Sequence, residues 1–197
     1  MIVEAGLRKG NARSGGSAEW YASRGLGVIG KIAPNRQVIT RADSAFCTHA
    51  HVTAVTDAGA WFSITIPQWK TVTAAIAAIP EEDWVGIEYP EAVWDEQAGG
   101  WVSDAEVAET AFTAFTSRRT DEHVTCRLVV RRVKRLGGNA SHGQDTLFDT
   151  HRHHAFITNS TLTTIDADRR HRGHAVIEQV ISELKHGRAL RVETVVN

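Results

Sequence analysis

The sequence has few cysteines and no long apolar run. Its two cysteines, Cys47 and Cys126, lie far apart and in no motif, so they suggest neither a disulfide framework nor a zinc knuckle. No run of about 18 apolar residues occurs, which argues against a transmembrane helix. The first residues also lack the apolar segment of a secretory signal. These absences predict a reduced, cytoplasmic protein with no membrane partner.

Net charge is also nearly absent, but the charge is unevenly distributed. The formal net charge is -1, and the hydrophobic content of 42% and charged content of 23% are ordinary for a soluble globular protein. The segment 118–135 nevertheless holds seven Lys and Arg residues against two acidic residues, and seven of the ten histidines follow residue 140. A basic second half favours an anionic polymer as partner. A solvated basic strand face explains the same pattern.

Strands and short helices alternate in the first part of the chain. A loop over residues 10–17 follows the first strand. Gly59 is expected to close the first helix, Pro67 to end the strand after it, and Pro80 to stop the second helix. The expected elements are strands at 2–7, 36–40 and 61–66 and helices at 48–59 and 72–79. This alternation predicts an α/β core with a parallel element.

The middle of the chain changes character. Residues 84–135 are short segments rich in aromatic and β-branched residues, with a hairpin turn expected between Trp94 and Trp101. We interpret them as a mostly antiparallel β-insertion. Residues 146–159 return as a strand, and a helix is expected from about Asp168. The predicted organisation is therefore a partial core over 1–83, the insertion over 84–135, and a return strand and final helix over 136–197.

Four ionisable residues line one flank of the predicted final helix. On a helical wheel, His171, His174, Glu178 and Lys185 fall within an arc of roughly 60° beside the apolar stripe that faces the core. A carboxylate at the edge of a buried face is partly desolvated and therefore suits a metal ligand. A solvated flank without a chemical role gives the same spacing.

Asp43 is a second candidate carboxylate. It ends a β-branched strand, and ligands of open α/β sheets bind outside the carboxyl ends of strands. Together with a carboxylate on a packed helix, it could hold divalent cations that activate an attacking oxygen. A helix N-cap or a turn is the alternative role for this residue.

Three histidines cluster in the return strand. Alternation would place His151 and His153 on one face and His154 on the other. Two imidazoles on one face could bind zinc, but no third ligand stands at a familiar spacing. Contact with phosphate, or a polar site in the core, is the alternative.

Several segments carry a family resemblance. In chain order they are RADSAF, WFSIT, AAIAAIPEEDW, YPEAVWDEQAGGWVSDAEVAETAFTAF, HHAFITNS and HRGHAVIEQVISELK. They resemble the DDE transposases of bacterial insertion sequences, in the branch with a β-rich insertion before the final catalytic glutamate, and the resemblance runs from about Leu7 to Leu190. It implies an α/β fold: an incomplete ribonuclease-H-like core with an antiparallel β-rich insertion before the last catalytic helix. It also implies DNA transposition, by strand cleavage and transfer that depend on Mg²⁺ (or Mn²⁺).

The resemblance assigns roles to single residues. The signature helix of the wider group reads Tyr, two residues, Arg, three residues, Glu, six residues, Lys, and histidines stand here where the group has Tyr and Arg. Asp43 and Glu178 match two catalytic acidic residues and metal ligands. The expected contacts to double-stranded DNA, at element ends and target, are His171, His174, Lys185, Arg131 and Arg132.

One acidic residue of the family's triad has no match. Before Asp43 the only acidic residues are Glu4 and Glu19, and neither stands in a fitting strand. We therefore expect a truncated core that binds Mg²⁺ weakly and is inactive by itself, because such a site lacks a bridging carboxylate. The alternatives are a catalytically dead DNA-binding remnant, or a regulator that acts on an intact transposase chain. A metal-binding protein built on the histidine strand ranks last.

Overall fold

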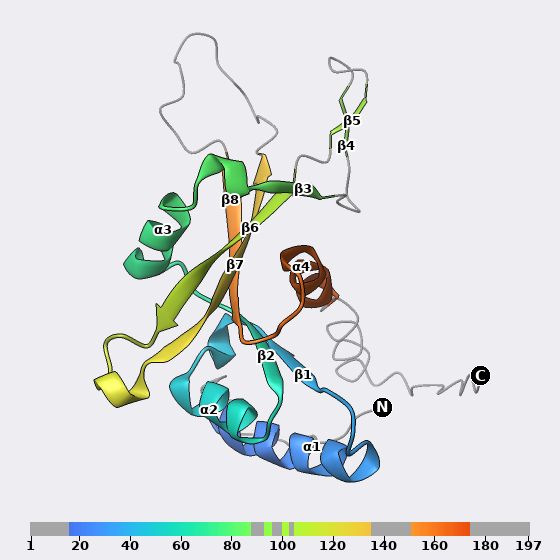
Figure 1. Cartoon of the computed structure of the whole chain (residues 1–197), viewed down its shortest axis with the longest axis vertical. Helices are drawn as coiled ribbons and strands as arrows, with labels where there is room; N and C mark the ends of the chain where they lie inside the picture. Colours follow the sequence, from blue (N-terminus) through green and yellow to red (C-terminus); the bar gives the residue numbers. More distant parts are fainter. Residues whose placement is uncertain (1–15, 88–92, 96–99, 103–104, 135–150, 174–197) are drawn as a thin grey trace, which may run out of the picture.

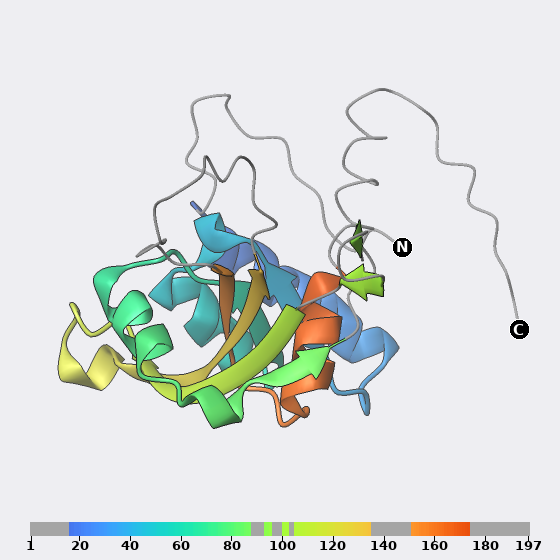
Figure 2. The same cartoon turned by 90° about the horizontal axis from the view of Figure 1, so that it is seen from above.

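The computed structural model describes residues 16–87, 93–95, 100–102, 105–134 and 151–173. Its helices and strands are α1 (Ala18–Ile32), β1 (Ile39–Ala42), α2 (His49–Asp57), β2 (Trp61–Thr65), α3 (Lys70–Ala77), β3 (Val85–Ile87), β4 (Val93–Asp95), β5 (Gly100–Val102), β6 (Ala105–Ala114), β7 (Val124–Lys134), β8 (His151–Thr158) and α4 (Thr164–Arg172). Six strands form one sheet in the order β1-β2-β8-β7-β6-β3, and helices lie on both of its faces (Figures 1 and 2). The fold is therefore mixed α/β with a mostly antiparallel sheet.

The parallel part of the sheet is the unit β1–α2–β2. β1 and β2 pair in parallel, with Ile39 opposite Trp61. The Thr48 side chain accepts a hydrogen bond from the His51 amide and caps the N-terminus of α2. Gly59 has φ of 69°, a conformation that favours glycine, and it lies just beyond the C-terminus of α2. The predicted parallel element and the predicted stops at Gly59, Pro67 and Pro80 are confirmed.

The rest of the sheet is antiparallel. β6 and β7 form a long hairpin, β3 pairs with β6, and β8 lies between β7 and β2. The mostly antiparallel character predicted for residues 84–135 is confirmed, and three strands of that segment belong to the main sheet. β4 and β5 pair separately with Trp94 opposite Trp101, as predicted for this hairpin.

Several element boundaries differ from the sequence expectation. β1 covers Ile39–Ala42 rather than 36–40, and α1 forms in a segment that the pattern leaves without structure. α4 begins at Thr164, four residues before Asp168, because the Thr163 hydroxyl caps its N-terminus by accepting from the Asp166 amide. The strand expected at residues 2–7 and the helix expected to continue beyond Gly173 lie outside the described residues.

Apolar side chains pack on both faces of the sheet. The larger cluster fills the space between the sheet and α1, α2 and α3, and includes the fully buried Val55, Phe62, Ile64 and Leu128. Each such side chain stabilises the fold by about 1.5–3 kcal/mol relative to exposure. On the other face, Ala167 of α4 packs against Val129 and Phe156 together with Leu162. α4 covers this second face and brings the polar groups described below against the sheet.

None of the helices within the described ranges has the length and apolar content needed to cross a membrane.

Candidate functional site

Asp43 lies directly after β1, at the carboxyl end of the parallel unit. Its Oδ1 accepts a hydrogen bond from the Ala45 amide at 2.9 Å, so it caps the short 3-10 helix Ser44–Phe46. The side chain is exposed, and its Oδ2 has no hydrogen-bond partner among the residues that the structure describes. Both roles expected from the sequence, a cap and an accessible carboxylate, are thus compatible with this position.

Arg41 precedes Asp43 by two residues and connects β1 to α4. Its Nη1 donates to the Arg170 carbonyl at 2.6 Å, a contact between residues 129 positions apart. Burial lowers the pKa of the Arg41 guanidinium, and the positive charge of Arg170 lowers it further. The end of α4 therefore lies beside the strand end that carries Asp43.

His171, in the last turn of α4, lies against the sheet. Its Nδ1 and the Ser63 hydroxyl are 2.8 Å apart, and its Nε2 and the Thr65 hydroxyl are 3.1 Å apart. Its ring stacks on Phe156, with centroids 4.1 Å apart and planes 4° from parallel. Because a hydroxyl can donate or accept, either neutral tautomer of the ring fits between the two oxygens. His171, which the sequence predicts to contact DNA, therefore holds α4 against β2 in the structure.

A buried ion-pair cluster lies beneath α4, and the sequence pattern did not indicate it. The Asp168 side chain is 1% exposed; its Oδ1 accepts from Arg131 Nη1 and its Oδ2 from Arg172 Nε, each at 2.7 Å. Arg131 comes from β7 and Arg172 from the same helix, one turn further on. This cluster fixes α4 to the sheet, and its only local signal in the sequence is the spacing of four between Asp168 and Arg172.

The two arginines predicted to contact DNA from β7 both bind carboxylates within the fold. Arg131 is 8% exposed and pairs with Asp168. Arg132 is 9% exposed, donates from Nε to Glu106 at 2.6 Å and from Nη1 to Glu81 at 2.9 Å. Its hydrogen bonds hold the pKa of Glu81 below its usual value. Whether either arginine contacts DNA stays a prediction, while both charges already have partners inside the protein.

The other described arginines of the basic segment are also matched by acidic groups. The pairs are Arg118 with Glu122, Arg119 with Asp121, and Arg127 with Glu109. Among the described residues of this segment, the arginine charges are therefore offset by carboxylates and do not form an open cationic face.

The three histidines of β8 divide between the faces of the sheet as the strand period predicts. The rings of His151 and His153 are 6.5 Å apart. His154 pairs with Arg131 across the sheet, and burial lowers its pKa, with further lowering by the charges of Arg131 and Arg152. Over the described part of the chain, no group of three or more His, Cys, Asp or Glu side chains is arranged to hold a metal ion.

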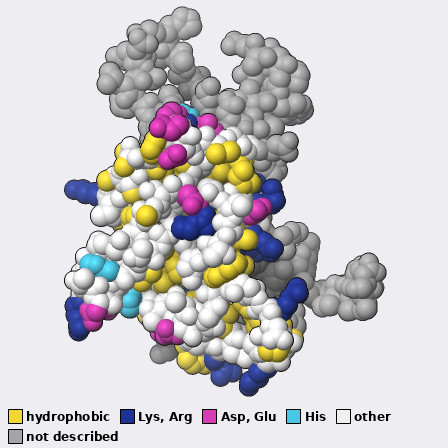
Figure 3. Space-filling view, in the orientation of Figure 1, with side chains coloured by type: hydrophobic (Ala, Val, Ile, Leu, Met, Phe, Trp, Pro, Cys, Tyr) yellow, Lys and Arg dark blue, Asp and Glu magenta, His cyan; other side chains and the backbone are white. Residues whose placement is uncertain are grey.

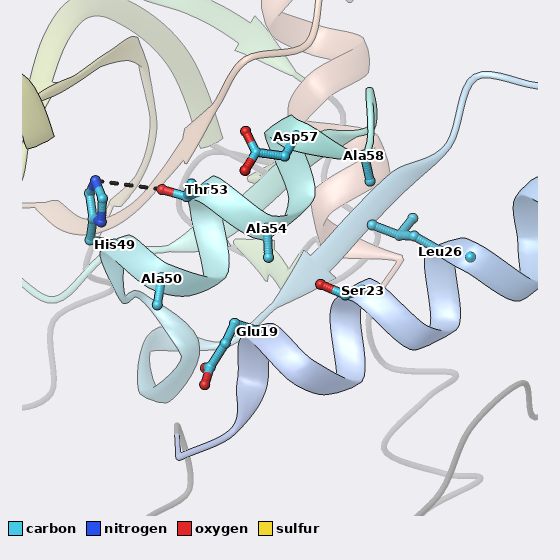
Figure 4. A pocket seen from close by; sticks show the side chains of 10 residues that line it. Glu19, Ser23, Leu26, His49, Ala50, Thr53, Ala54, Asp57 and Ala58 are labelled. Atoms are coloured by element: carbon cyan, nitrogen blue, oxygen red, sulfur yellow. Dashed lines mark hydrogen bonds between the residues drawn. The ribbon is translucent and has the colours of Figure 1, made fainter.

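An open hollow of about 700 Å³ lies between α1 and α2 (Figure 4). Its ionisable residues are Glu19, His49 and Asp57, which point in different directions (Figure 4). His49 Nε2 lies 3.5 Å from the Thr53 hydroxyl. Since these groups do not converge, the hollow is a weaker candidate than the edge formed by β1 and α4.

The remaining predicted residues, His174, Glu178 and Lys185, lie outside the described residues. Comparison of the chain with protein-family models and with curated proteins finds no match.

Proposed function

We propose that this chain is a transposase-like protein of the DDE type, with an incomplete ribonuclease-H-like core, that acts on double-stranded DNA. The observation that carries the proposal is the contact between Arg41 and Arg170. It joins the RADSAF segment to the residue directly before the HRGHAVIEQVISELK segment, and the resemblance depends on these two motifs. The parallel unit β1–α2–β2, with Asp43 at its carboxyl end, also supports the proposal.

Asp43 fits the role of a magnesium ligand. Mg²⁺ takes oxygen ligands and is usually held by one or two carboxylates together with waters and substrate phosphates. The exposed Asp43 carboxylate offers one oxygen beyond the one used for capping. When bound, the ion would activate the attacking oxygen and stabilise the leaving oxygen at a DNA phosphodiester. Glu178 is the second ligand in this proposal.

A second candidate function is DNA binding without cleavage, as a remnant or as a regulator of an intact transposase. The observation that favours it is the capping role of Asp43, because a cap of this kind stabilises a helix end by about 0.5–2 kcal/mol without any metal. In this case Asp43 only stabilises the local fold, and the basic residues of the chain bind the DNA.

Plasmid nicking separates the two candidates. Purified chain is incubated with supercoiled DNA and Mg²⁺ or Mn²⁺, and Asp43→Asn is compared with the exposed control Asp57→Asn. Asparagine caps helices as well as aspartate does, so Asp43→Asn removes the charge and keeps the fold. Any nicking by the wild-type chain should fall to background in Asp43→Asn alone.

The other outcomes are also informative. Equal nicking by Asp43→Asn and wild type would refute the metal-ligand role of Asp43. Duplex binding without metal-dependent nicking in the wild type would favour the second candidate. Absence of salt-dependent duplex binding would refute both.

A further inference from the structure

The last turn of α4 carries more positive charge than its carboxylates match. Four basic residues, 169–172, follow one another there. Arg169 pairs with Asp166 at 3.0 Å and Arg172 with Asp168 at 2.7 Å. Arg170 is exposed and has no carboxylate partner within the described part of the chain. Figure 3 shows Lys and Arg side chains along the flank on which α4 lies.

Arg41 brings a second guanidinium to the end of α4. Its Nη1 donates to the carbonyl of Arg170, and among the described residues no acidic side chain pairs with it. A guanidinium has five N–H donors in a planar fork that matches phosphate oxygens, and the contact to Arg170 uses one side of that fork. The rest of the fork can donate to an anion at this edge.

Gly173 leaves the room that the Arg41 guanidinium occupies. Its φ of -59° is accessible to any residue, so the backbone does not require glycine there. A Cβ at this position would come within 2.8 Å of Arg41 Nη1, whereas the next atom, the Arg170 carbonyl oxygen, is 3.6 Å away. The glycine therefore permits the guanidinium to lie across the end of the helix.

Stabilisation of the helix end explains only part of this arrangement. Cations near a helix C-terminus interact favourably with its dipole, by about 0.3–1 kcal/mol each. That accounts for one cation at the carbonyl of Arg170. It does not account for an exposed Arg170 on the same edge, in a turn that already holds two other arginines.

We propose that Arg41 and Arg170 together bind a backbone phosphate of double-stranded DNA, beside Asp43. The inference rests on the proposed function and names the substrate group that this edge holds. Arg41 and Asp43 are two positions apart in extended backbone, so strand alternation directs both toward the same side of the sheet. The edge is open rather than enclosed, which fits a polymer backbone better than a free phosphate. A phosphate held here lies next to the carboxylate that the proposed function assigns to the metal.

The salt dependence of duplex binding tests this site. The full chain is titrated into a fluorescein-labelled DNA duplex of mixed sequence, followed by anisotropy at several KCl concentrations. Arg41→Gln and Arg170→Gln are each expected to weaken binding several-fold and to reduce the slope of log affinity against log salt by about 0.9. The control Arg119→Gln changes an arginine that is 79% exposed and pairs with Asp121; it is expected to leave the slope unchanged.

Gly173→Ala gives a test that leaves the net charge intact. It is expected to shift the Arg41 guanidinium and to weaken duplex binding, but to change the salt slope less than Arg41→Gln does, because the charge of Arg41 remains. Circular dichroism of each variant shows whether it is folded, and Arg170→Gln, at an exposed position, preserves the fold in any case.

Three results would overturn the proposal. Wild-type slopes in both Arg41→Gln and Arg170→Gln would place the DNA contacts elsewhere and leave the proposed function standing. Inorganic phosphate that binds the chain as tightly as the duplex would indicate a site for a free anion. No salt-dependent duplex binding by the wild-type chain would remove the proposed function, and this inference with it.

Discussion

Asp168 is the residue whose change should most affect the stability of the fold. Its carboxylate is 1% exposed and accepts from Arg131 and Arg172, whose side chains are 10% and 19% exposed. Asp168→Asn keeps the shape of the side chain but removes the buried negative charge to which Arg131 and Arg172 donate. Removal of one partner from a buried ion pair lowers the free energy of unfolding by about 3–5 kcal/mol. We expect about 3 kcal/mol, because the asparagine oxygen can still accept one hydrogen bond.

Urea unfolding followed by far-ultraviolet circular dichroism measures this effect. With a slope of about 2 kcal/mol per molar urea, a loss of about 3 kcal/mol lowers the midpoint by about 3/2, or 1.5 M. The matched control is Asp121→Asn, which breaks the ion pair with Arg119 at side chains that are 63% and 79% exposed. An exposed pair of this kind contributes about 0–1 kcal/mol.

A double variant tests the physical reason. Replacement of a buried ion pair by apolar side chains is often neutral or stabilising, so Asp168→Leu combined with Arg131→Met should be more stable than Asp168→Asn. The reasoning fails if Asp168→Asn shifts the midpoint no more than Asp121→Asn does. It also fails if the double variant is less stable than the single one.

Three smaller effects can be measured with the same unfolding assay. Ser63→Ala removes a hydrogen bond to His171 and should lower stability by about 1 kcal/mol. Burial holds the pKa of His51 below its usual value, so the unfolded chain takes up a proton that the folded chain does not. Stability should therefore fall as the pH drops through about 6.5, and His51→Gln should flatten that part of the curve. Gly27→Ala and Gly30→Ala, where an added Cβ meets nothing within 4 Å, should each raise stability by about 0.5–1 kcal/mol.

Each of these three expectations has a control or a contrary result. An unchanged midpoint in Ser63→Ala would show that its hydroxyl contributes nothing to holding α4. An unchanged pH dependence in His51→Gln would contradict the role of burial at this histidine. Gly59→Ala should destabilise the fold, because its φ of 69° disfavours any side chain. Stabilisation by that change would contradict the backbone argument.

Local signals predicted the ends of elements well. Gly59, Pro67 and Pro80 act on their own neighbourhood, through a positive φ or a missing amide hydrogen, and the helices and strand they delimit were predicted from them. α1 was missed because its three glycines, at positions 25, 27 and 30, lower helix propensity. Packing of Leu26 in the main apolar cluster stabilises the helix instead, and this contact cannot be inferred from α1 alone.

The position of Asp43 at a strand end could be predicted from the sequence, but the contacts that hold α4 beside it could not. Asp43 could be placed after a strand because the apolar run stops there. The partners of Asp168 on β7 and of His171 on β2 lie 37 to 108 positions away. They are neighbours only because of the sheet order and because α4 covers that face. Ser63 and Thr65, polar residues at alternate positions of a strand, were the one signal that this face of β2 meets a polar group.

Pairing, rather than the number of basic residues in a segment, decides which arginines are candidates for DNA contact. Arg131 and Arg132 belong to the most basic stretch of the sequence, yet both are buried and hold carboxylates of the fold. Arg41 and Arg170 come from distant segments, yet the Arg41 guanidinium lies at the exposed end of α4, where it donates to the Arg170 carbonyl. A phosphate gains most where it does not have to displace a carboxylate that is already bound. For this reason we propose a DNA contact at the edge where β1 and α4 end, while contacts by Arg131 and Arg132 stay a prediction.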